Sequence, residues 1–308
     1  MSRIIREGAS VTMIDIHEDI SLKFIDWPEI SRATEQVHKA VQWIARLGKA
    51  YVPSQADDSH INMGWNSEEE YFYGHWFADY SLRLAFRPND FAWLILDENF
   101  TINDSLGGWG RTDEDVWEWL QISLNKRGVD ADLLQYDLHY NLPYEHDLKT
   151  VYGIVDEAVL NAFSRLRTLG NLMTKAALLF ANPGNIQGGI RTWPHHFDAG
   201  CSIPLAMDNK EEVLRSLGVG MAIHDQMINQ YYLYVSSWTK NSVFNYHELP
   251  DLPSGGYWVS SEGWNGAVLP FDKLREPQSF LLDKGVLFLI AAIETISDLK
   301  PQNISNQV

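Results

Sequence analysis

The sequence contains a single cysteine, Cys201, among 308 residues. One thiol cannot form an intramolecular disulfide, and it cannot supply the several thiolates of a zinc or iron–sulfur cluster. Any bound metal ion would have to be held mainly by His, Asp or Glu side chains.

Positive charge is also scarce, with 24 Lys and Arg against 41 Asp and Glu and a net charge of −17. Such a surface repels a phosphate backbone, so nucleic acid is not expected as a partner. No apolar run approaches the roughly 20 residues of a membrane-spanning helix, and charges interrupt the N-terminal segment where a signal peptide would be apolar. We therefore expect a soluble, cytoplasmic protein with no membrane partner.

Familiar catalytic motifs are missing as well. The chain has no Gly-x-x-x-x-Gly-Lys-Ser/Thr phosphate loop, no Gly-x-Gly-x-x-Gly after a strand, no Gly-x-Ser-x-Gly elbow and no His-Glu-x-x-His zinc motif. Nucleotide binding and serine hydrolysis are therefore disfavoured.

Hydrophobic periodicity predicts an α+β fold with antiparallel sheets rather than a steady β-α-β alternation. Residues 31–48 have helical spacing, with Ser31 suited to the N-cap and Gly48 to the position after the helix. Residues 82–86 and 91–96 alternate with period two on either side of a turn, so they predict a hairpin.

The rest of the chain continues in the same way. Thr112 and Asp115 have the spacing of a capping box, ahead of a helix that Gly128 ends. Residues 150–181 predict one long helix, or two helices broken near Gly170. Three strands and a closing helix follow, at 197–206, 217–224, 230–237 and 278–296.

The domain organisation follows from these elements. Residues 1–31 have weak periodicity and predict an N-terminal arm. Residues 32–308 predict one compact domain, or two packed lobes of about 32–148 and 149–308. Both halves place strands before a helix and contain the tripeptide Gly-Trp-Asn, so a diverged duplication is a hypothesis.

The segment 193–198 is the most unusual in the sequence. If a strand runs from residue 196 to 205, His196 and Asp198 share one face while Cys201 lies on the opposite, apolar face. Cys201 is then an inert core residue and not a nucleophile. On the same argument we expect His196 to contact a ligand and His195 to be a packed residue at the border of the cleft.

The next two strands predict the rest of that cleft. Residues 217–224 alternate bulky side chains with a nearly bare strip that contains Gly218 and Gly220 and leaves room for a small-molecule ligand. Apolar pockets with a few polar groups at the edge are the usual small-molecule sites. The other residues expected to line it are His224, Asp225, Tyr232, Tyr234, Trp258 and Trp264.

Three interpretations of these residues remain open. In the structural one, His196 and Asp198 bond to each other and to nearby backbone, as most His–Asp pairs do. In the metal one, His196, Asp198 and His224 hold a divalent metal cofactor, iron or zinc, with open positions. In the third, Asp198 orients His196 as a catalytic general base without metal, or the pair simply binds a polar ligand. The sequence leaves open whether the protein is an enzyme.

Several segments together resemble a bacterial family of domains of unknown function. The likeness covers most of the chain after about residue 32 and includes Leu47-Gly-Lys49 and His60. The other segments are Trp193-Pro-His-His-Phe-Asp198, Gly218-Val-Gly220 with His224-Asp225, Tyr231-Tyr-Leu-Tyr-Val-Ser236, Leu252-Pro-Ser-Gly-Gly256 with Trp258, and Glu262-Gly-Trp264 to Ala267-Val-Leu269. The family has no established activity, so the resemblance implies kinship without a substrate or catalytic residues.

Overall fold

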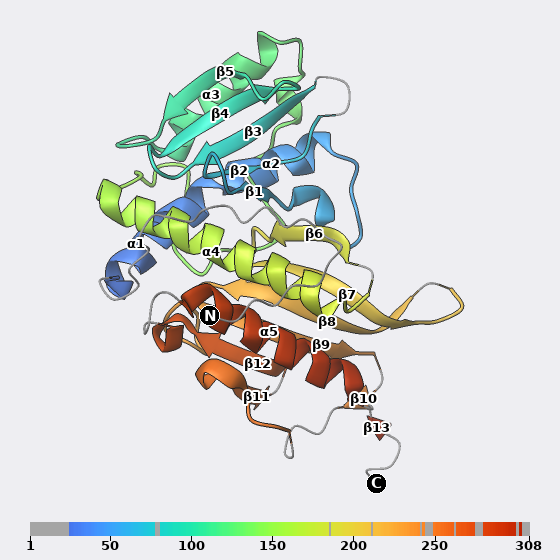
Figure 1. Ribbon diagram of the computed structural model, residues 1–308. Coiled ribbons are helices and arrows are strands. Elements are labelled where there is room, and N and C mark those ends of the chain that lie inside the picture. The colour runs from blue at the N-terminus through green and yellow to red at the C-terminus, as the bar shows by residue number, and fades with distance from the viewer. Residues whose placement is uncertain are drawn as a thin grey trace.

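The structure, a computed structural model, consists of two antiparallel sheets flanked by helices, which confirms the predicted α+β class (Figure 1). The described residues are 25–77, 81–184, 186–210, 212–240, 242–243, 249–261, 263–274, 280–299 and 302–303. The predicted N-terminal arm lies outside the described residues as far as residue 24, and from Trp27 onward the chain is helical.

The helices are α1 (Trp27–Ala40), α2 (Gln42–Tyr51), α3 (Asp113–Asn125), α4 (Glu157–Ala181) and α5 (Leu281–Asp298). The smaller sheet contains β1 (Gly64–Asn66), β2 (Tyr71–Tyr73), β3 (Leu82–Arg87), β4 (Ala92–Asp97) and β5 (Ile102–Gly107), paired in that order. The larger sheet contains β6 (Gln187–Thr192), β7 (Ala199–Met207), β8 (Val213–Ala222), β9 (Tyr232–Thr239), β11 (Tyr257–Ser261) and β12 (Trp264–Pro270). Its strand order is β11-β12-β9-β8-β7-β6. A short ribbon pairs β10 (Ser242–Val243) with β13 (Gln302–Asn303).

The predicted helix at 31–48 is in fact two helices. α1 begins at Trp27 with a proline in its first turn, so Ser31 lies inside the helix and is not its cap. Val41 separates α1 from α2. Gly48 lies inside α2, where a Cβ would be 2.5 Å from the carbonyl oxygen of His60. Close approach of another backbone, and not the end of the helix, therefore requires this glycine.

Other local predictions are confirmed. β3 and β4 form the expected antiparallel hairpin, and Thr112 and Asp115 form a complete capping box at the start of α3. α4 starts later than predicted but is a single helix that continues through Gly170. A Cβ at Gly170 would clash with the sulfur of Met221, so the glycine lets α4 lie close to the larger sheet.

One face of the larger sheet is covered by α4 and α5 (Figure 1). The residues on this face include the register partners Ala267, Val235, Val219 and Cys201, all of which are buried. Cys201 is therefore a core residue, as predicted. Burial raises the pKa of its thiol to about 12, which keeps the sulfur protonated and unreactive.

The two sheets meet at a β-bridge in which Met63 and Thr192 exchange backbone hydrogen bonds of 3.0 and 2.7 Å. A single core cluster includes side chains from both sheets and from all five helices. Since Thr192 ends β6, the bridge also fixes the start of the loop that leads into β7. None of the helices in the described ranges combines the length and the hydropathy that crossing a bilayer requires.

Candidate functional site

The loop between β6 and β7, residues 193–198, is closed by two backbone hydrogen bonds. The N–H of Phe197 donates to the carbonyl of Trp193 (2.7 Å), and the N–H of Trp193 donates to the carbonyl of Asp198 (3.1 Å). Phe197 has a φ of 59°, a left-handed conformation that is rare for a bulky residue. Strand β7 begins only at Ala199. The prediction of a regular strand from residue 196 is therefore wrong, because the chain turns there.

Two buried side chains hold this loop in place. Arg167 of α4 donates from Nη2 to the carbonyl of Phe197 (2.7 Å), and its guanidinium carbon lies 4.5 Å from the centre of the Phe197 ring. The ring of His38 in α1 stacks on Phe197 with a centroid distance of 4.6 Å and an interplanar angle of 5°. These contacts offset the roughly 1–3 kcal/mol that a strained backbone conformation costs. Such strain occurs mostly at functional loops.

His38 is a neutral, structural histidine. Its Nε2 lies 2.7 Å from the carbonyl oxygen of Pro194, which can only accept, so Nε2 carries the proton. Nδ1 then accepts from the hydroxyl of Tyr144 at 3.1 Å. Burial lowers the pKa of His38 to about 3, although the hydrogen bond to Pro194 acts in the opposite direction.

Two further loops approach the loop at 193–198. The ring of His195 lies 4.4 Å from that of His196 and 5.6 Å from that of Tyr140. His139 and Asp58, which also act electrostatically on His195, lie 2.8 Å apart between Nε2 and Oδ2. Asp58 also has a left-handed conformation, with a φ of 59°. We call the side chains of Asp58, His139, Tyr140, His195, His196 and Asp198 the three-loop cluster.

The three-loop cluster combines accessibility with altered protonation. His196 is exposed, whereas His195 and Asp198 are half-buried. Burial, helped by the neighbouring His196, lowers the pKa of His195. Burial also raises the pKa of Asp198, although the hydroxyl of Tyr234 donates to its Oδ2 at 2.7 Å. The two groups therefore titrate closer to each other than an ordinary imidazole and carboxyl do.

His196 is exposed and His195 is half-buried, and the expectation that His196 contacts a ligand stays a prediction. Strand alternation predicted the directions of the His195 and His196 side chains, but residues 194–196 form a turn. Within the described chain, the hydrogen-bond partner of the Asp198 side chain is Tyr234 and not His196.

The strip of small residues on β7 and β8 is filled by Tyr234. A Cβ on Gly200 would clash with the Tyr234 hydroxyl, and one on Gly218 would lie 3.6 Å from the Cε2 atom of its ring. The Tyr234 ring thus takes part of the room that the sequence predicted above Gly218, and a Cβ at Gly220 would meet the backbone of Ala199 and Gly200. The missing side chains let the Tyr234 ring cross β8 and reach Asp198.

The predicted residues after β8 form a separate turn. The Oδ1 atom of Asp225 accepts from the N–H groups of Met227 and Ile228, and its Oδ2 atom accepts from the hydroxyl of Tyr232 at 2.7 Å. Asp225 therefore closes a turn. His224 is half-buried, burial lowers its pKa, and its Nδ1 has no hydrogen-bond partner among the described residues.

The metal ligands that the sequence suggested are not brought together. Nowhere in the described ranges are three or more His, Cys, Asp or Glu side chains positioned to hold a metal ion. His196, Asp198 and His224 therefore do not form the expected ligand set. The reason is local, since His196 lies in a turn and Asp198 bonds to Tyr234.

The two tryptophans predicted for the cleft lie on opposite faces of the larger sheet. Trp258 is paired with Ala267, packs against the main core and donates to the carbonyl of Pro250 at 2.9 Å. Trp264 packs on the other face, in a small cluster with Tyr232 and Tyr234. Trp264 therefore shares a face with the partner of Asp198, and Trp258 does not.

Sequence reasoning missed the residues that hold the loop. A signal for one set exists, because Thr34, His38 and Gln42 are spaced by four residues and form a buried polar row within an apolar stripe. Gln42 and His38 both donate to the carbonyl of Pro194. Arg167 gives a similar signal, a charged residue on the core-facing side of a long helix. Nothing in the irregular segment around Tyr140 predicts its position.

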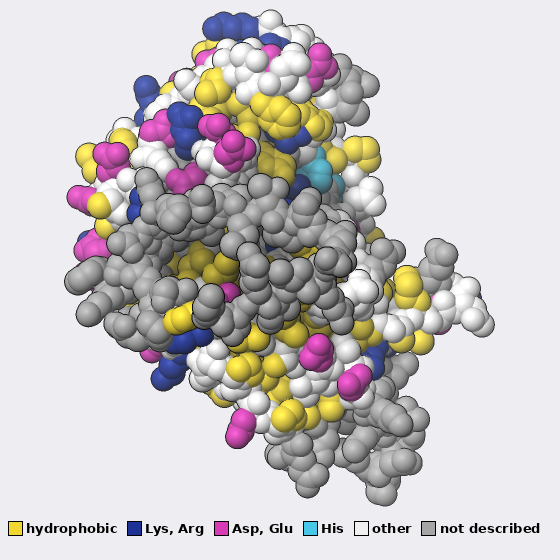
Figure 2. Space-filling model, in the orientation of Figure 1, with side chains coloured by type: hydrophobic (Ala, Val, Ile, Leu, Met, Phe, Trp, Pro, Cys, Tyr) yellow, Lys and Arg dark blue, Asp and Glu magenta, His cyan; other side chains and the backbone are white. Residues whose placement is uncertain are grey.

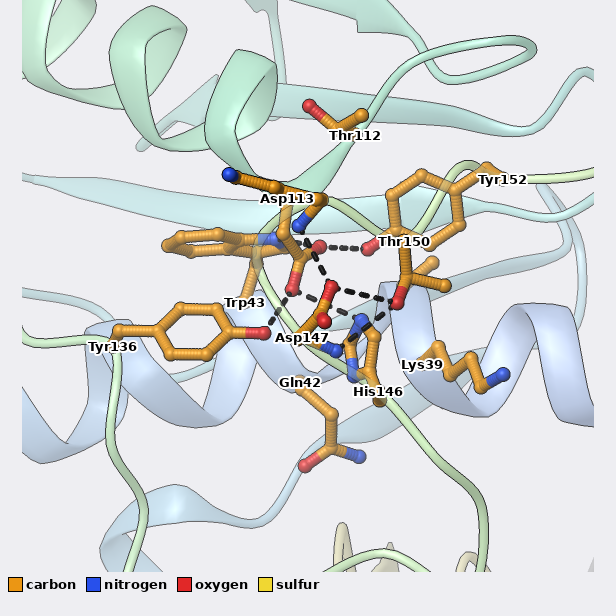
Figure 3. Close-up of polar contacts among 12 residues, drawn as sticks. Lys39, Gln42, Trp43, Thr112, Asp113, Tyr136, His146, Asp147, Thr150 and Tyr152 are labelled. Atoms are coloured by element: carbon orange, nitrogen blue, oxygen red, sulfur yellow. Dashed lines mark hydrogen bonds and ion pairs between the residues drawn. The ribbon is translucent and has the colours of Figure 1, made fainter.

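A second polar cluster lies at the start of α3 (Figure 3). The carboxylate of Asp113, which is completely buried, accepts from Nε1 of Trp43 (2.9 Å) and from the hydroxyls of Tyr136 (3.0 Å) and Tyr152. His146 Nε2 lies 3.0 Å away. Burial acts to raise the pKa of Asp113, but these neighbours outweigh it and the pKa is lowered. Because its oxygens are occupied, we interpret Asp113 as a structural anchor.

Comparison with known proteins gives no match: no protein-family model fits the chain, and no curated protein and no solved structure is significantly similar to it. The resemblance to a bacterial family of domains of unknown function stays a prediction. The three-loop cluster therefore has to be judged on its own geometry.

Proposed function

We propose that the protein binds a small polar molecule at the three-loop cluster and exchanges a proton with it through His195 and Asp198. The observation that carries this proposal is the strained loop. A buried arginine and a buried histidine hold Phe197 in a left-handed conformation, and the same loop presents His195, His196 and Asp198. A loop held in this way orients its side chains before a ligand arrives.

The protonation states suit acid–base chemistry. The lowered pKa of His195 keeps its imidazole neutral at neutral pH, so it can accept a proton. The raised pKa of Asp198 lets its carboxyl group retain a proton to higher pH than an ordinary aspartate, so it can donate one. His196 is exposed, and in this proposal its imidazole orients the ligand.

Ligand-observed NMR on the intact chain tests the proposal. The probes are a panel of small alcohols, amides, carboxylic acids and phosphate esters. At least one class should show saturation transfer from the wild type, and the signal should be lost in His196→Ala and in Asp198→Asn. Asp225→Asn is the matched control, since Asp225 also bonds to a tyrosine hydroxyl but lies outside the cluster. A silent panel, or a signal that survives both cluster variants, contradicts the proposal.

A purely structural role for Asp198 makes a different prediction about stability. Burial raises the folded-state pKa of Asp198 above that of the unfolded chain, so at pH values above its ordinary pKa, including pH 7, this group lowers the free energy of unfolding. Asparagine carries no charge and can still accept from Tyr234. We therefore expect Asp198→Asn to raise the midpoint of thermal unfolding at pH 7, as is common when a functional charge is removed. A lower midpoint would favour the structural interpretation.

A further inference from the structure

The smaller sheet has a second apolar face, away from the main core. Its inner face, with Phe86 and Trp93, belongs to the core that includes α2 and α3. The second face has a cluster of its own, formed by Tyr71, Ala85, Ala92, Leu94 and Leu96. Phe100 and Ile102 at its border are 56% and 48% exposed. Figure 2 shows hydrophobic side chains gathered over β3 to β5 on this face.

This face contains a hollow of about 320 Å³. Leu94, Leu96 and Ile102 lie along it, and the rings of Tyr71 and Phe100 border it. The volume falls near the lower end of the roughly 300–1,000 Å³ of small-molecule sites. A hollow of this size and lining fits the apolar part of a small ligand.

Arg83, which has no counter-ion among the described residues, lies next to the hollow: it is not one of the lining residues, but its guanidinium is close to the bordering ring of Phe100. Arg83 is the register partner of Leu96, which in turn pairs with Ile102, so the three side chains share the face. Arg83 is 8% exposed, its Nε has no hydrogen-bond partner, and no ion pair joins it to a carboxylate among the described residues. Its guanidinium carbon lies 3.3 Å from the centre of the Trp76 ring and 5.3 Å from that of Phe100.

The two ends of the hollow differ in charge. Arg87 also lines it, four residues along β3 and therefore about 13 Å from Arg83. Asp90 neutralises Arg87 with two hydrogen bonds, of which the one from Nε is 2.8 Å long, and Glu69 lies at the same end. Beyond the other end, Arg191 adds positive charge near Tyr73, 5.7 Å from its ring. The uncompensated positive charge is thus at the Arg83 end.

We propose that this face is a second binding site, which takes a small amphipathic carboxylic acid with its apolar chain in the hollow and its carboxylate on Arg83. The carboxylate supplies the counter-ion and acceptor that the described part of the chain does not provide for this buried guanidinium. The neutralised arginine at the far end sets the direction of the chain. The site uses none of the residues of the three-loop cluster.

Isothermal titration of the intact protein with decanoate tests this site, and decanol is the matched neutral probe. Decanoate should bind at least about tenfold more tightly than decanol, as expected when a charged hydrogen bond is lost. Arg83→Gln should weaken decanoate binding by a similar factor. Arg111→Gln, which removes an exposed arginine outside the hollow, is the control and should change decanoate binding less than about twofold.

A second variant keeps the test decisive if Arg83→Gln does not fold. Ile102→Glu changes an exposed residue and places a negative charge at the hollow, so decanoate binding should be lost while the unfolding midpoint is kept. Asp198→Asn should leave decanoate affinity unchanged, which separates this site from the three-loop cluster. Three results would each overturn the proposal. They are equal affinity for decanoate and decanol, unchanged decanoate binding in Arg83→Gln or Ile102→Glu, and no binding of millimolar decanoate to the wild type.

Discussion

Arg167 contacts Phe197 twice, with a hydrogen bond to its carbonyl oxygen and with its guanidinium over the face of its ring. Both residues are completely buried. The Nε and Nη1 atoms of Arg167 have no hydrogen-bond partner among the described residues. A buried cation with unpaired donors costs stability, so the loop at 193–198 is held by an arrangement that is unfavourable for the helix that supplies it.

The first prediction is that these two residues are energetically coupled. Arg167→Met removes the donor to the Phe197 carbonyl, and Phe197→Leu removes the ring while keeping apolar bulk. Because both variants break the same contact, their effects on the free energy of unfolding should differ from additivity by about 0.5 kcal/mol or more in a urea double-mutant cycle. Leu120→Ala, in α3, gives the control pair with Arg167→Met and should be additive. Additivity of the Arg167 and Phe197 variants would contradict the coupling.

The second prediction concerns acid sensitivity through His38. In the unfolded chain the pKa of His38 is about 6.5, whereas in the folded protein it is about 3. The unfolded state therefore binds more protons between these values, and the free energy of unfolding should fall by up to about 1.4 kcal/mol per pH unit as the pH drops through that window.

His38→Gln provides the comparison, because glutamine keeps a donor for Pro194 and does not titrate. Urea unfolding at several pH values between about 4 and 7 should give a flatter pH profile for the variant. Parallel profiles would show that His38 is protonated in the fold, or that it does not hold the loop as described.

Local patterns predicted those parts of the fold that local forces determine. The β3–β4 hairpin and the Thr112 capping box depend on residues that are close in sequence. Gly48 and Gly218 were misread because each is explained by a group distant in sequence: the carbonyl of His60 for Gly48, and the side chains of Ser236 and, more loosely, Tyr234 for Gly218. A sequence shows that a glycine is present but not which neighbour approaches it.

The candidate site illustrates the same limit more strongly. The sequence identified Asp198 and both neighbouring histidines, but their directions depend on His38, which is 156 residues from its partner Pro194. The left-handed conformation of Phe197 has no local signal, since a phenylalanine rarely adopts it. Tertiary contacts, and not alternation, therefore set which side chains of the loop reach the surface.

The third prediction compares two glycines under Tyr234. A Cβ at Gly200 would clash with the Tyr234 hydroxyl and lie 2.9 Å from the backbone carbonyl of Val219, which cannot move aside. A Cβ at Gly218 would mainly meet the Oγ atom of Ser236 at 2.5 Å, and a serine can rotate away. Gly200→Ala should lower the free energy of unfolding by about 1–3 kcal/mol, and Gly218→Ala by less than about 1 kcal/mol. Chemical denaturation measures both, and the reverse order would mean that Tyr234 does not lie across Gly200.

The last prediction concerns the buried carboxylate of Asp113. Arg46 Nη1 lies 3.7 Å from the carboxylate of Asp113, so Asp113→Asn would leave this buried guanidinium without its counter-charge. A loss of about 3–5 kcal/mol in the free energy of unfolding is expected at pH 7. Although burial opposes them, the hydrogen bond from His146 and the charge of Arg46 hold the pKa of Asp113 below that of an ordinary aspartate. Its contribution to stability is thus present above the ordinary pKa and is lost as the pH falls through the lower, folded value. The wild type should therefore approach the variant in stability only below about pH 4.

Asp115→Asn, two residues along the same helix and half-exposed, is the control and should cost about 1 kcal/mol through the capping box alone. Equal losses for the two variants would mean that Asp113 acts only as a charge at the helix start, and that its bonds to Trp43 and the tyrosines do not anchor the fold.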